Sequence, residues 1–397
     1  MSGPLSGIRV VDLTAMASGP FATSLLGDQG ADVIKIEPPG TGDLIRRIGN
    51  SRKGFSAVFA NLNRSKRSVV LNLAEARGVE VLDRLVETAD VFVQNFRPGV
   101  ADRMQIGADR LRRLNPELIY VSISGFGEAG ADANRRVYDS VMQAYAGFAA
   151  HQADPETHEP AFVHNIVCDK STALTTAQTI TAALFARERG AGGQHLKISM
   201  LHASIAFLWP DAMQNYTWLD AGSANGEGSM SRGTLPAIRQ TADGHVAITT
   251  VGDAEYRGLC RALERPDLQD DPRFAEAGNR TRNAGTLHEI VAPLTRALTT
   301  AELVDRLSAE DVPHAPVTAL ATLHEHPQVV ANDLLPEDEH PVGGPMRAPR
   351  PGGDVEKTPI ELRRHAPALG EHTDEVLAEL GIGDDERKSL RDLQIVA

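Results

Sequence analysis

The sequence predicts an α/β fold with a mainly parallel sheet. In the N-terminal half of the chain, short runs rich in β-branched residues alternate with segments typical of helices. A strand that is followed by a helix returns to its sheet through a crossover, so this alternation indicates parallel neighbouring strands. Ligands of such sheets bind beyond the carboxyl ends of the strands, so the residues that follow each strand are the first candidates for a site.

The predicted elements follow one another in a regular order. Strands are predicted at residues 8–13, 32–37, 68–73, 90–96, 118–123 and 195–199, and helices at 20–27, 74–89 and 175–187. The apolar segment 200–218 is predicted to be helical with an interruption at Pro210. Pro20 suits a first helical position, where its missing N–H costs nothing.

Composition predicts the domain organisation. Residues 221–235 are rich in Gly and Ser, as is typical of a linker. Residues 1–220 and 335–397 are therefore predicted to form a large domain, and residues 236–334 a small α/β domain. The small domain is predicted to contain a strand at 244–249 and helices at 255–263, 286–298 and 300–307, the last capped by Thr299 or Thr300. A final helix is predicted between Gly370 and Gly381.

The composition also excludes several classes of protein. A net charge of −13, with scattered basic residues, argues against a nucleic-acid partner. Residues 1–7 have no basic region followed by an apolar core, and no apolar run approaches the length of a membrane span. The two cysteines, Cys168 and Cys260, are far apart and have no metal-ligand spacing. We therefore expect a reduced, cytoplasmic protein that does not bind a membrane.

Three kinds of catalytic site lack their sequence signature. The loop at residues 14–20 has no G-x-G-x-x-G, which makes a dinucleotide-dependent oxidoreductase a remote alternative. No P-loop is present, and the histidine pairs lie in polar loops without the spacing of a zinc site, so no metal is expected. Cys168 is a minor alternative as a nucleophile, because nothing near it in the sequence indicates an activated thiol.

Asp169 has two interpretations. It precedes a segment, 175–187, that is rich in Ala and Leu, so it lies at or just before a helix start. As an N-cap, its carboxylate would accept hydrogen bonds from the first free N–H groups of the helix. A carboxylate at the positive end of a helix also stays ionised and fixed in direction, as a nucleophile must be. The local sequence leaves both interpretations open.

Basic residues gather near the predicted strand ends. Arg97 and Arg103 follow one strand, Arg135 and Arg136 precede a helix, and residues 63–68 form a basic turn. Guanidinium groups bind phosphate through paired, charge-assisted hydrogen bonds, so these positions suit an anionic ligand such as a nucleotide phosphate. Taken singly, each is equally typical of a solvated loop.

A further pattern extends over nearly the whole chain. Its segments are residues 5–12, 30–37, 66–68, 89–99, 122–127, 192–194, 271–274 and 370–373. Their order and spacing resemble the family III CoA-transferases. That group includes formyl-CoA transferase, the carnitine CoA-transferases and the α-methylacyl-CoA racemases.

The resemblance implies a large Rossmann-like domain built from both ends of the chain and joined to the small domain by long linkers. It implies a homodimer in which two chains interlock as rings. It also places the catalytic carboxylate on Asp169, which favours the nucleophile over the N-cap. The residues that match CoA contacts of the family are Leu71, Asn72, Leu73, Asn95, Phe96, Arg97, Arg103, Met104, Arg136, Val137, Tyr138 and Met200.

Tyr138 separates two activities within the resemblance. The racemases have a His here, next to an Asp, and pair it with the carboxylate that matches Asp169. A phenol with a pKa of about 10 is a poor base at neutral pH, and the formyl-CoA transferases are similar to this chain in having a Tyr. Tyr138 favours CoA transfer, with an acyl-CoA racemase as the alternative. Ala17 replaces a Gln of formyl-CoA transferase, and Pro38 and Ala74 replace basic CoA contacts of some relatives. The resemblance therefore does not assign the donor acid or the acceptor acid.

The expected reaction moves CoA from an acyl-CoA thioester to a free carboxylic acid. Asp169 attacks the thioester to give a mixed anhydride, and the returning thiolate gives an aspartyl-CoA thioester. Backbone N–H groups of Ala17, Ser18 and Gly19, or those at the start of the Asp169 helix, are expected to stabilise the oxyanions, with Tyr138 in support. CoA and acyl-CoA enter as substrates, and no tightly bound cofactor is expected.

Overall fold

The computed structural model describes residues 3–154, 157–219 and 237–397. The chain divides into two compact units, one formed by Met1–Phe207 with Asp333–Ala397 and the other by Leu208–Asn332. The first unit therefore combines both ends of the chain. The linker predicted at residues 221–235 lies outside the described residues.

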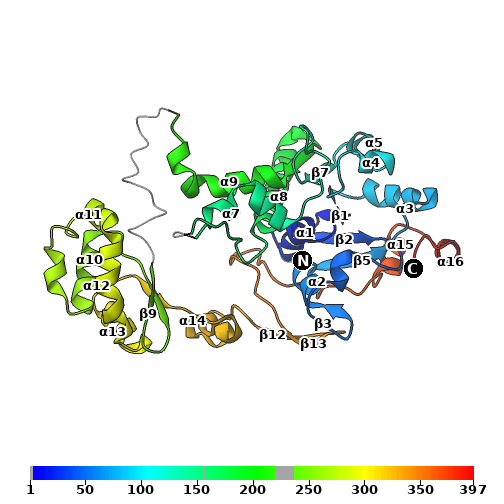
Figure 1. Cartoon of the computed structure of the whole chain (residues 1–397). Coiled ribbons are helices and arrows are strands. Elements are labelled where there is room, and N and C mark those ends of the chain that lie inside the picture. Colours follow the sequence, from blue (N-terminus) through cyan, green and yellow to red (C-terminus); the bar gives the residue numbers. More distant parts are fainter. Residues whose placement is uncertain (1–2, 155–156, 220–236) are drawn as a thin grey trace. The chain divides into compact units, whose positions relative to one another are not determined.

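A six-stranded parallel sheet forms the centre of the first unit (Figure 1). Its strand order is β5-β2-β1-β6-β7-β8. The bounds are β1 (Arg9–Asp12), β2 (Asp32–Glu37), β5 (Lys66–Val70), β6 (Val91–Gln94), β7 (Ile119–Ser124) and β8 (His195–Ser199). β1 pairs in parallel with β2 on one side and with β6 on the other, so the order reverses at β1. The predicted α/β class with a mainly parallel sheet is confirmed, and the reversal opens a crevice at the carboxyl end of β1.

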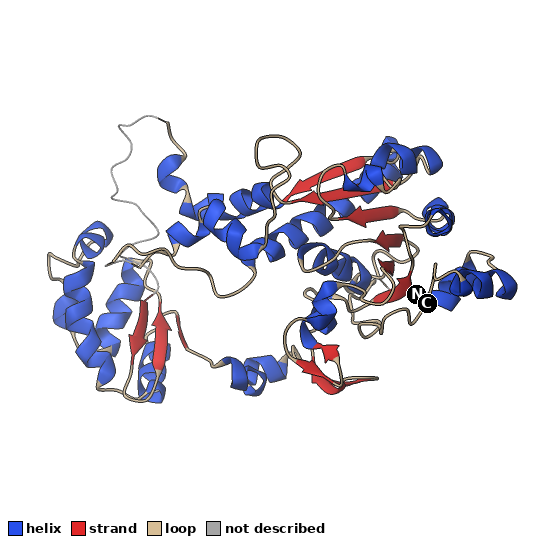
Figure 2. Cartoon of the chain, turned by 45° about the vertical axis from the view of Figure 1, so that its right-hand side comes forward, coloured by secondary structure: helices blue, strands red, loops and turns tan. Residues whose placement is uncertain are grey.

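Helices cover both faces of this sheet (Figure 2). On one face, α1 (Ser18–Asp28) and α8 (Val167–Ala186) pack on alternate side chains of the strands. The opposite face is covered by α3 (Ala76–Glu87), α5 (Ala108–Leu114), α15 (Thr373–Glu379) and α16 (Asp384–Asp392). Because β-strand side chains alternate in direction, Val10 faces α1 and α8 while Val11 faces the other helices.

Shorter elements complete the first unit. They are η1 (Leu44–Arg47), α2 (Ala57–Leu62), α4 (Val100–Arg103), α6 (Asp139–Tyr145), α7 (Phe148–His151), β3 (Ser51–Arg52) with β4 (Phe55–Ser56), and β12 (Glu337–His340) with β13 (Gly344–Arg347). The helix α9 (Met200–Ala212) follows β8 and contains Pro210, which lies only two residues before its end.

The second unit has a three-stranded antiparallel sheet of order β11-β10-β9. The strands are β9 (Ala237–Gln240), β10 (His245–Ile248) and β11 (His314–Pro316), and the helices are α10 (Asp253–Ala262), α11 (Ala277–Arg282), α12 (Ala284–Arg296), α13 (Thr300–Ala309) and α14 (Pro327–Ala331). Thr299 caps α13 in a capping box with Glu302, whose N–H donates to the Thr299 hydroxyl at 3.2 Å.

Two differences between the predicted elements and the structure have a clear physical cause. The strand predicted at 68–73 is β5, which begins at Lys66, because the first two side chains are basic yet buried by ion pairs that local propensity does not reveal. Only one helix was predicted at the C-terminus, whereas α16 follows α15. Of its nine residues only Leu390 is buried, so its sequence has little apolar periodicity.

Candidate active site

A cavity of about 1040 Å³ lies at the carboxyl edge of the parallel sheet. Its wall includes residues 15–18 after β1, 95–98 after β6 and 123–125 at the end of β7. These strands are neighbours in the sheet, and the carboxyl ends of parallel strands meet at one edge. The start of α8, with Asp169, forms part of the same wall. The topology thus gathers loops that are far apart in the sequence around one carboxylate.

Asp169 is the third residue of α8 rather than its N-cap. The helix begins at Val167, earlier than the sequence indicated, and its N-cap position is Ile166, whose side chain makes no capping bond. The N-cap interpretation of Asp169 is therefore wrong. The carboxylate of Asp169 is free to line the cavity because a different side chain satisfies the helix start.

That side chain is Asp139, the first residue of α6. Its Oδ2 atom accepts hydrogen bonds from the N–H groups of Cys168 at 2.8 Å and Asp169 at 3.0 Å. The Oδ1 atom accepts a bond of 2.6 Å from Nε2 of Gln143, one turn further along α6. Asp139 is buried, so this carboxylate caps α8 from a separate helix.

Gln143 also holds the loop that leads into α8. Its Oε1 atom accepts from the N–H of Val163 at 2.9 Å, and its Nε2 atom donates to the carbonyl of Asn165 at 3.0 Å. The side chain is buried. Gln143 therefore fixes both the Asp139 carboxylate and the chain that precedes Asp169.

The pKa of Asp169 is raised to about 6. Burial is the main cause, the negative charge of Asp139 adds to it, and hydrogen bonds from the hydroxyl and N–H of Ser18 oppose it. Ser18 is the first residue of α1. The N-termini of α1 and α8, each with a positive partial charge, therefore meet at this carboxylate.

The loop residues proposed from the sequence occupy different positions. Ala17 and Ser18 line the cavity. Gly19 is buried against the side chain of Thr14, which a Cβ at this position would overlap. The glycine thus allows close packing within the loop. Tyr138 is 60% exposed and lines the cavity as the residue before Asp139.

The residues that match CoA contacts divide between two adjoining cavities. Asn95, Phe96, Arg97, Arg136, Val137, Tyr138 and Met200 line the larger cavity. Leu71, Asn72, Leu73, Phe96 and Met104 line a second cavity of about 330 Å³. Ala15 and Phe96 belong to both walls, so the cavities are neighbours. Arg103 lines neither cavity and is exposed at the end of α4.

The arginines of this region differ from those of the basic turn. Within the described part of the chain, the guanidinium groups of Arg97, Arg103 and Arg136 have no hydrogen-bonding or ion-pairing partner. In the turn at 63–68, by contrast, Arg64 pairs with Asp28 at 2.9 Å, and the buried Lys66 and Arg67 are also paired with carboxylates. The prediction that this turn suits an anionic ligand is wrong, because its charges are already neutralised inside the fold.

Three further features considered from the sequence are a reactive thiol, a metal site and a membrane span. Burial raises the pKa of the Cys168 thiol to about 12, so it stays protonated near neutral pH. Among residues 3–154, 157–219 and 237–397, no group of three or more His, Cys, Asp or Glu side chains could hold a metal ion. No described helix combines the length and the apolar character needed to cross a membrane.

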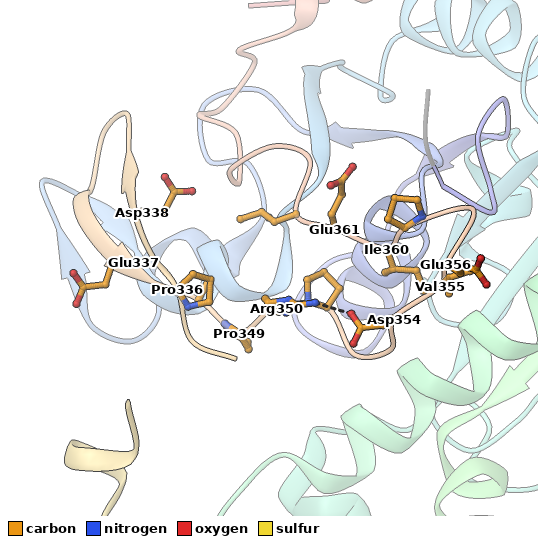
Figure 3. Close-up of a pocket in the computed structure, with 14 residues that line it drawn as sticks. Pro336, Glu337, Asp338, Pro349, Arg350, Asp354, Val355, Glu356, Ile360 and Glu361 are labelled. Atoms are coloured by element: carbon orange, nitrogen blue, oxygen red, sulfur yellow. Dashed lines mark hydrogen bonds and ion pairs between the residues drawn. The ribbon is translucent and has the colours of Figure 1, made fainter. Parts of the chain in front are cut away.

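A separate cavity of about 440 Å³ lies along the segment from Pro336 to Leu362 (Figure 3). An ion pair of 2.6 Å joins Arg350 to Asp354 on its wall. The wall also carries Glu337, Asp338, Glu356 and Glu361. This acidic surface is unsuited to a polyanionic ligand, and none of the residues around Asp169 contributes to it.

Sequence reasoning missed the role of two residues in this site. Asp139 was noticed only as the neighbour of Tyr138, and Gln143 was not singled out. The i, i+4 spacing of Asp139 and Gln143, at the start of the helix expected after Arg136, is the signal in the sequence, because it places both side chains on one helix face. Their partners on α8 are visible only in the fold.

Comparisons with known proteins place the whole chain in one family. The family model described as CoA-transferase family III matches residues 5–373. The chain is 31% identical over 384 residues to succinyl-CoA:glutarate CoA-transferase of Homo sapiens, covering 96% of this chain and 87% of the relative. It is 32% identical over 418 residues to formyl-CoA:oxalate CoA-transferase of Streptomyces avermitilis, covering 98% and 99%.

A solved structure shows the same fold. The crystal structure of a CAIB/BAIF family protein from Brucella suis matches with a TM-score of 0.83 and 29% identity, covering 96% of this chain and 100% of that one. Fold, site and relatives together define an enzyme of the CoA-transferase class. The chain belongs to CoA-transferase family III.

Proposed function

We propose that this enzyme transfers CoA from an acyl-CoA thioester to a free carboxylic acid, with Asp169 as the nucleophile. The observation that carries the proposal is the position of the Asp169 carboxylate, in the cavity wall and opposite the start of α1. A pKa of about 6 keeps this carboxylate mostly ionised at neutral pH yet more basic than a solvated one.

The first half-reaction has two steps. A carboxylate oxygen of Asp169 attacks the thioester carbonyl carbon, the C–S bond breaks, and CoA leaves as a thiolate. The product is a mixed anhydride between Asp169 and the acyl group. The thiolate then attacks the aspartyl carbonyl carbon, the donor acid leaves as a carboxylate, and an aspartyl-CoA thioester remains. Energy is exchanged between acyl carriers of comparable reactivity, so no external energy source is needed.

The second half-reaction reverses these steps with the acceptor acid. The acceptor carboxylate attacks the aspartyl thioester, which releases the thiolate and gives a new anhydride. The thiolate attacks the acceptor carbonyl, which forms the new acyl-CoA and returns Asp169 to its carboxylate. Each attack places negative charge on a carbonyl oxygen, either that of the acyl group or that of Asp169 itself. The N–H of Ser18 and the positive end of α1 are suited to stabilise this charge.

CoA is proposed to lie across the two adjoining cavities. Arg97 and Arg136 line the larger cavity without an intramolecular partner in the described chain, and they are suited to the phosphate groups. The smaller cavity, lined by Leu71, Leu73 and Met104 among others, suits a flat apolar group such as the adenine ring. The succinyl, glutaryl, formyl and oxalyl groups named for relatives are the first donors and acceptors to test.

We also propose that the enzyme is a homodimer with interlocked chains. Large apolar side chains are exposed on the helices around the site, with Phe185 of α8 65% exposed and Phe207 of α9 55% exposed. Exposed apolar surface of this kind favours burial in an interface. Light scattering coupled to size exclusion should give twice the mass of the chain, and a monomeric mass would contradict this part.

The test of the mechanism is to trap the intermediate. Enzyme mixed with acyl-CoA and hydroxylamine should carry a hydroxamate on Asp169, located by peptide mass spectrometry. Asp169→Ala should abolish transfer and trapping while CoA binding remains. The alternative activity, racemisation, predicts no covalent adduct and rapid exchange of solvent deuterium into the α-position of a 2-methylacyl-CoA. That outcome with an unmodified Asp169 would replace the transferase mechanism.

A further inference from the structure

The loop between β1 and α1 carries Ser18, and side chains from other elements hold its backbone. The N–H and carbonyl of Ala15 bond to the side chain of Asn95 at 3.0 and 2.8 Å. The carbonyl of Thr14 accepts from Nζ of Lys35 at 2.7 Å. The N–H of Met16 donates to Oδ1 of Asp43 at 3.1 Å. Three consecutive residues are thus fixed before the chain reaches Ala17 and Ser18.

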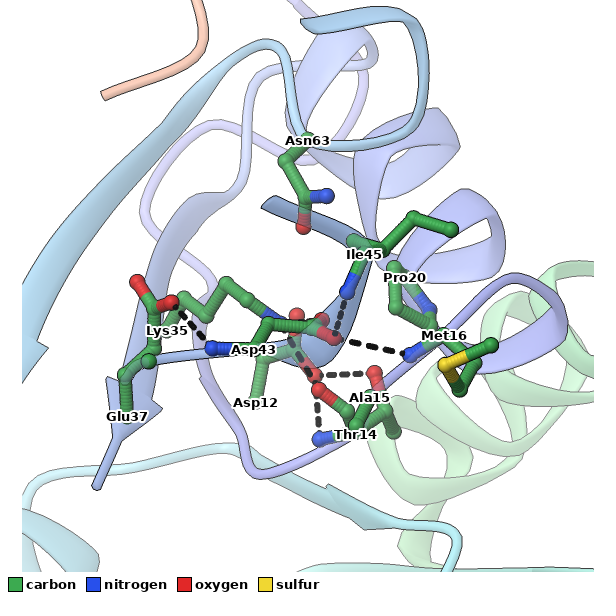
Figure 4. A network of polar contacts seen from close by, with 12 residues as sticks. Asp12, Thr14, Ala15, Met16, Pro20, Lys35, Glu37, Asp43, Ile45 and Asn63 are labelled. Atoms are coloured by element: carbon green, nitrogen blue, oxygen red, sulfur yellow. Dashed lines mark hydrogen bonds and ion pairs between the residues drawn. The ribbon is translucent and has the colours of Figure 1, made fainter. Parts of the chain in front are cut away.

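Met16 has a backbone conformation that side-chain-bearing residues rarely adopt. Its φ is 71°, in the left-handed region, where the Cβ comes too close to the following carbonyl oxygen. Such a conformation persists only where its surroundings determine it. The bond from the Met16 N–H to Asp43 is the contact that ties this residue to a neighbouring element. Figure 4 shows the two side by side.

Asp43 is itself held firmly. The Oδ1 atom that accepts from Met16 also accepts from the N–H of Ile45 at 3.1 Å, which caps η1. The Oδ2 atom pairs with Nζ of Lys35 at 3.0 Å, and both side chains are buried. The backbone N–H of Asp43 donates to Glu37 at 3.0 Å. A buried carboxylate needs such a compensating charge, and Lys35 supplies it.

Lys35 belongs to a larger buried network (Figure 4). Asp12, at the end of β1, accepts from Nζ of Lys66 at 2.9 Å and from the N–H of Thr14 at 2.9 Å. Burial acts to lower the pKa of Lys35, but Asp12, Asp43 and Glu37 outweigh it and raise that pKa, so Lys35 stays charged. This network anchors Thr14 at the start of the same loop, two residues before Met16, which Asp43 holds.

We propose that Asp43 is a positioning residue for catalysis. By holding the Met16 N–H in a left-handed turn, Asp43 directs the following residues, Ala17 and Ser18, against the Asp169 carboxylate. The role rests on the proposed function, since it concerns the environment of the nucleophile. A purely structural buried ion pair would stabilise the fold without affecting the reactivity of Asp169.

Three variants separate these roles. Asp43→Asn keeps an oxygen that can accept from Met16 and Ile45, and it should retain most of kcat. Asp43→Ala removes the acceptor and should lower kcat by about 10- to 100-fold, a loss comparable to that of misplacing one oxyanion donor or reacting group. The double variant Lys35→Met/Asp43→Ala avoids leaving Lys35 without its Asp43 partner, and it should be at least as slow as Asp43→Ala because the Thr14 carbonyl also loses its donor.

Asp28→Asn is the matched control. Asp28 is a buried carboxylate in the same unit, ion-paired with Arg64 at 2.9 Å and located at the opposite end of α1 from Ser18. This variant should leave kcat per folded molecule and CoA affinity at the wild-type level. Because Asp43 lines the smaller cavity proposed for CoA, its variants are compared by kcat at saturating acyl-CoA, which does not depend on CoA affinity.

The pH profile supplies a readout that a structural role would not move. Loss of the Ser18 hydrogen bonds, which lower the pKa of Asp169, should move the acidic limb of kcat to higher pH in Asp43→Ala. Wild-type kcat per folded molecule together with an unmoved limb would overturn the positioning role. If Asp169→Ala also keeps full activity, the proposed function itself fails, so the two failures are distinguishable.

Discussion

The Oδ2 atom of Asp139 accepts a hydrogen bond of 3.0 Å from the backbone N–H of Asp169, 30 residues further along the chain. The two carboxylates therefore have different tasks within one helix terminus. Asp139 caps the helix and takes up its free N–H groups, and its negative charge faces Asp169. Asp169 is left as a basic carboxylate at the cavity, as nucleophilic attack requires.

Asp139→Asn should lower kcat by about 10-fold and move the acidic limb of the rate profile to lower pH. Removing the like charge lowers the pKa of Asp169 and so weakens it as a nucleophile. Initial rates across the pH range measure both effects. Asp83→Asn is the control, because this carboxylate pairs with Arg110 away from the cavity. An acidic limb that stays in place in Asp139→Asn would contradict the electrostatic role.

The wild-type enzyme should lose activity as the pH falls through about 6, the pKa of Asp169. The sign follows from the chemistry, since only the ionised carboxylate attacks the thioester and protonation removes it. The acidic limb of the kcat/KM profile reports the pKa of Asp169 in the free enzyme. It is measured by varying acyl-CoA at a saturating concentration of the acceptor acid. Full activity retained well below pH 5 would show that a group of lower pKa carries the reaction.

Asp169→Asn should be inactive yet more stable than the wild type at neutral pH. The folded pKa of about 6 lies above the ordinary value of 3.8, so ionisation is disfavoured in the fold. The resulting loss of folding stability is absent below the pKa of Asp169 in the unfolded chain and complete above its pKa in the folded protein. It amounts to on the order of 1–3 kcal/mol. Thermal unfolding at neutral and at acidic pH should show a gain that shrinks on acidification. An N-cap role would instead give a loss of about 1 kcal/mol.

Arg97→Ala, Arg103→Ala and Arg136→Ala should each weaken CoA binding. Loss of a charge-assisted bond to phosphate costs on the order of 1.5–3 kcal/mol, or about 10-fold or more in Kd. Calorimetric titration with CoA measures the change. Arg110→Ala is the control, because that arginine is already paired with Asp83, whereas Arg97, Arg103 and Arg136 have no partner in the described chain. Wild-type affinity in all three variants would show that these arginines are only solvated.

Local sequence was sufficient for much of the fold. The β-branched run at residues 32–37 predicted β2 with the observed bounds, and 195–199 predicted β8 in the same way. Aliphatic residues two positions apart, Ile34 and Ile36 in β2 and Leu196 and Ile198 in β8, give the period of a strand, which a short window reveals. The prediction was weaker at β5, where buried Lys66 and Arg67 read as solvent-exposed residues. Their partners lie on other strands and helices, beyond the range of local pattern.

The sequence by itself determined the α/β class and the family resemblance, and through that resemblance it proposed Asp169 as the reactive carboxylate. The tertiary structure decided how that carboxylate is prepared for its task. Asp139 and Asp43 reach it only through packed elements, one by capping α8 and the other by holding Met16 at the start of the loop that carries Ser18. Local composition cannot encode these relationships, because a pKa or a capping bond depends on which distant groups are brought together when water is excluded.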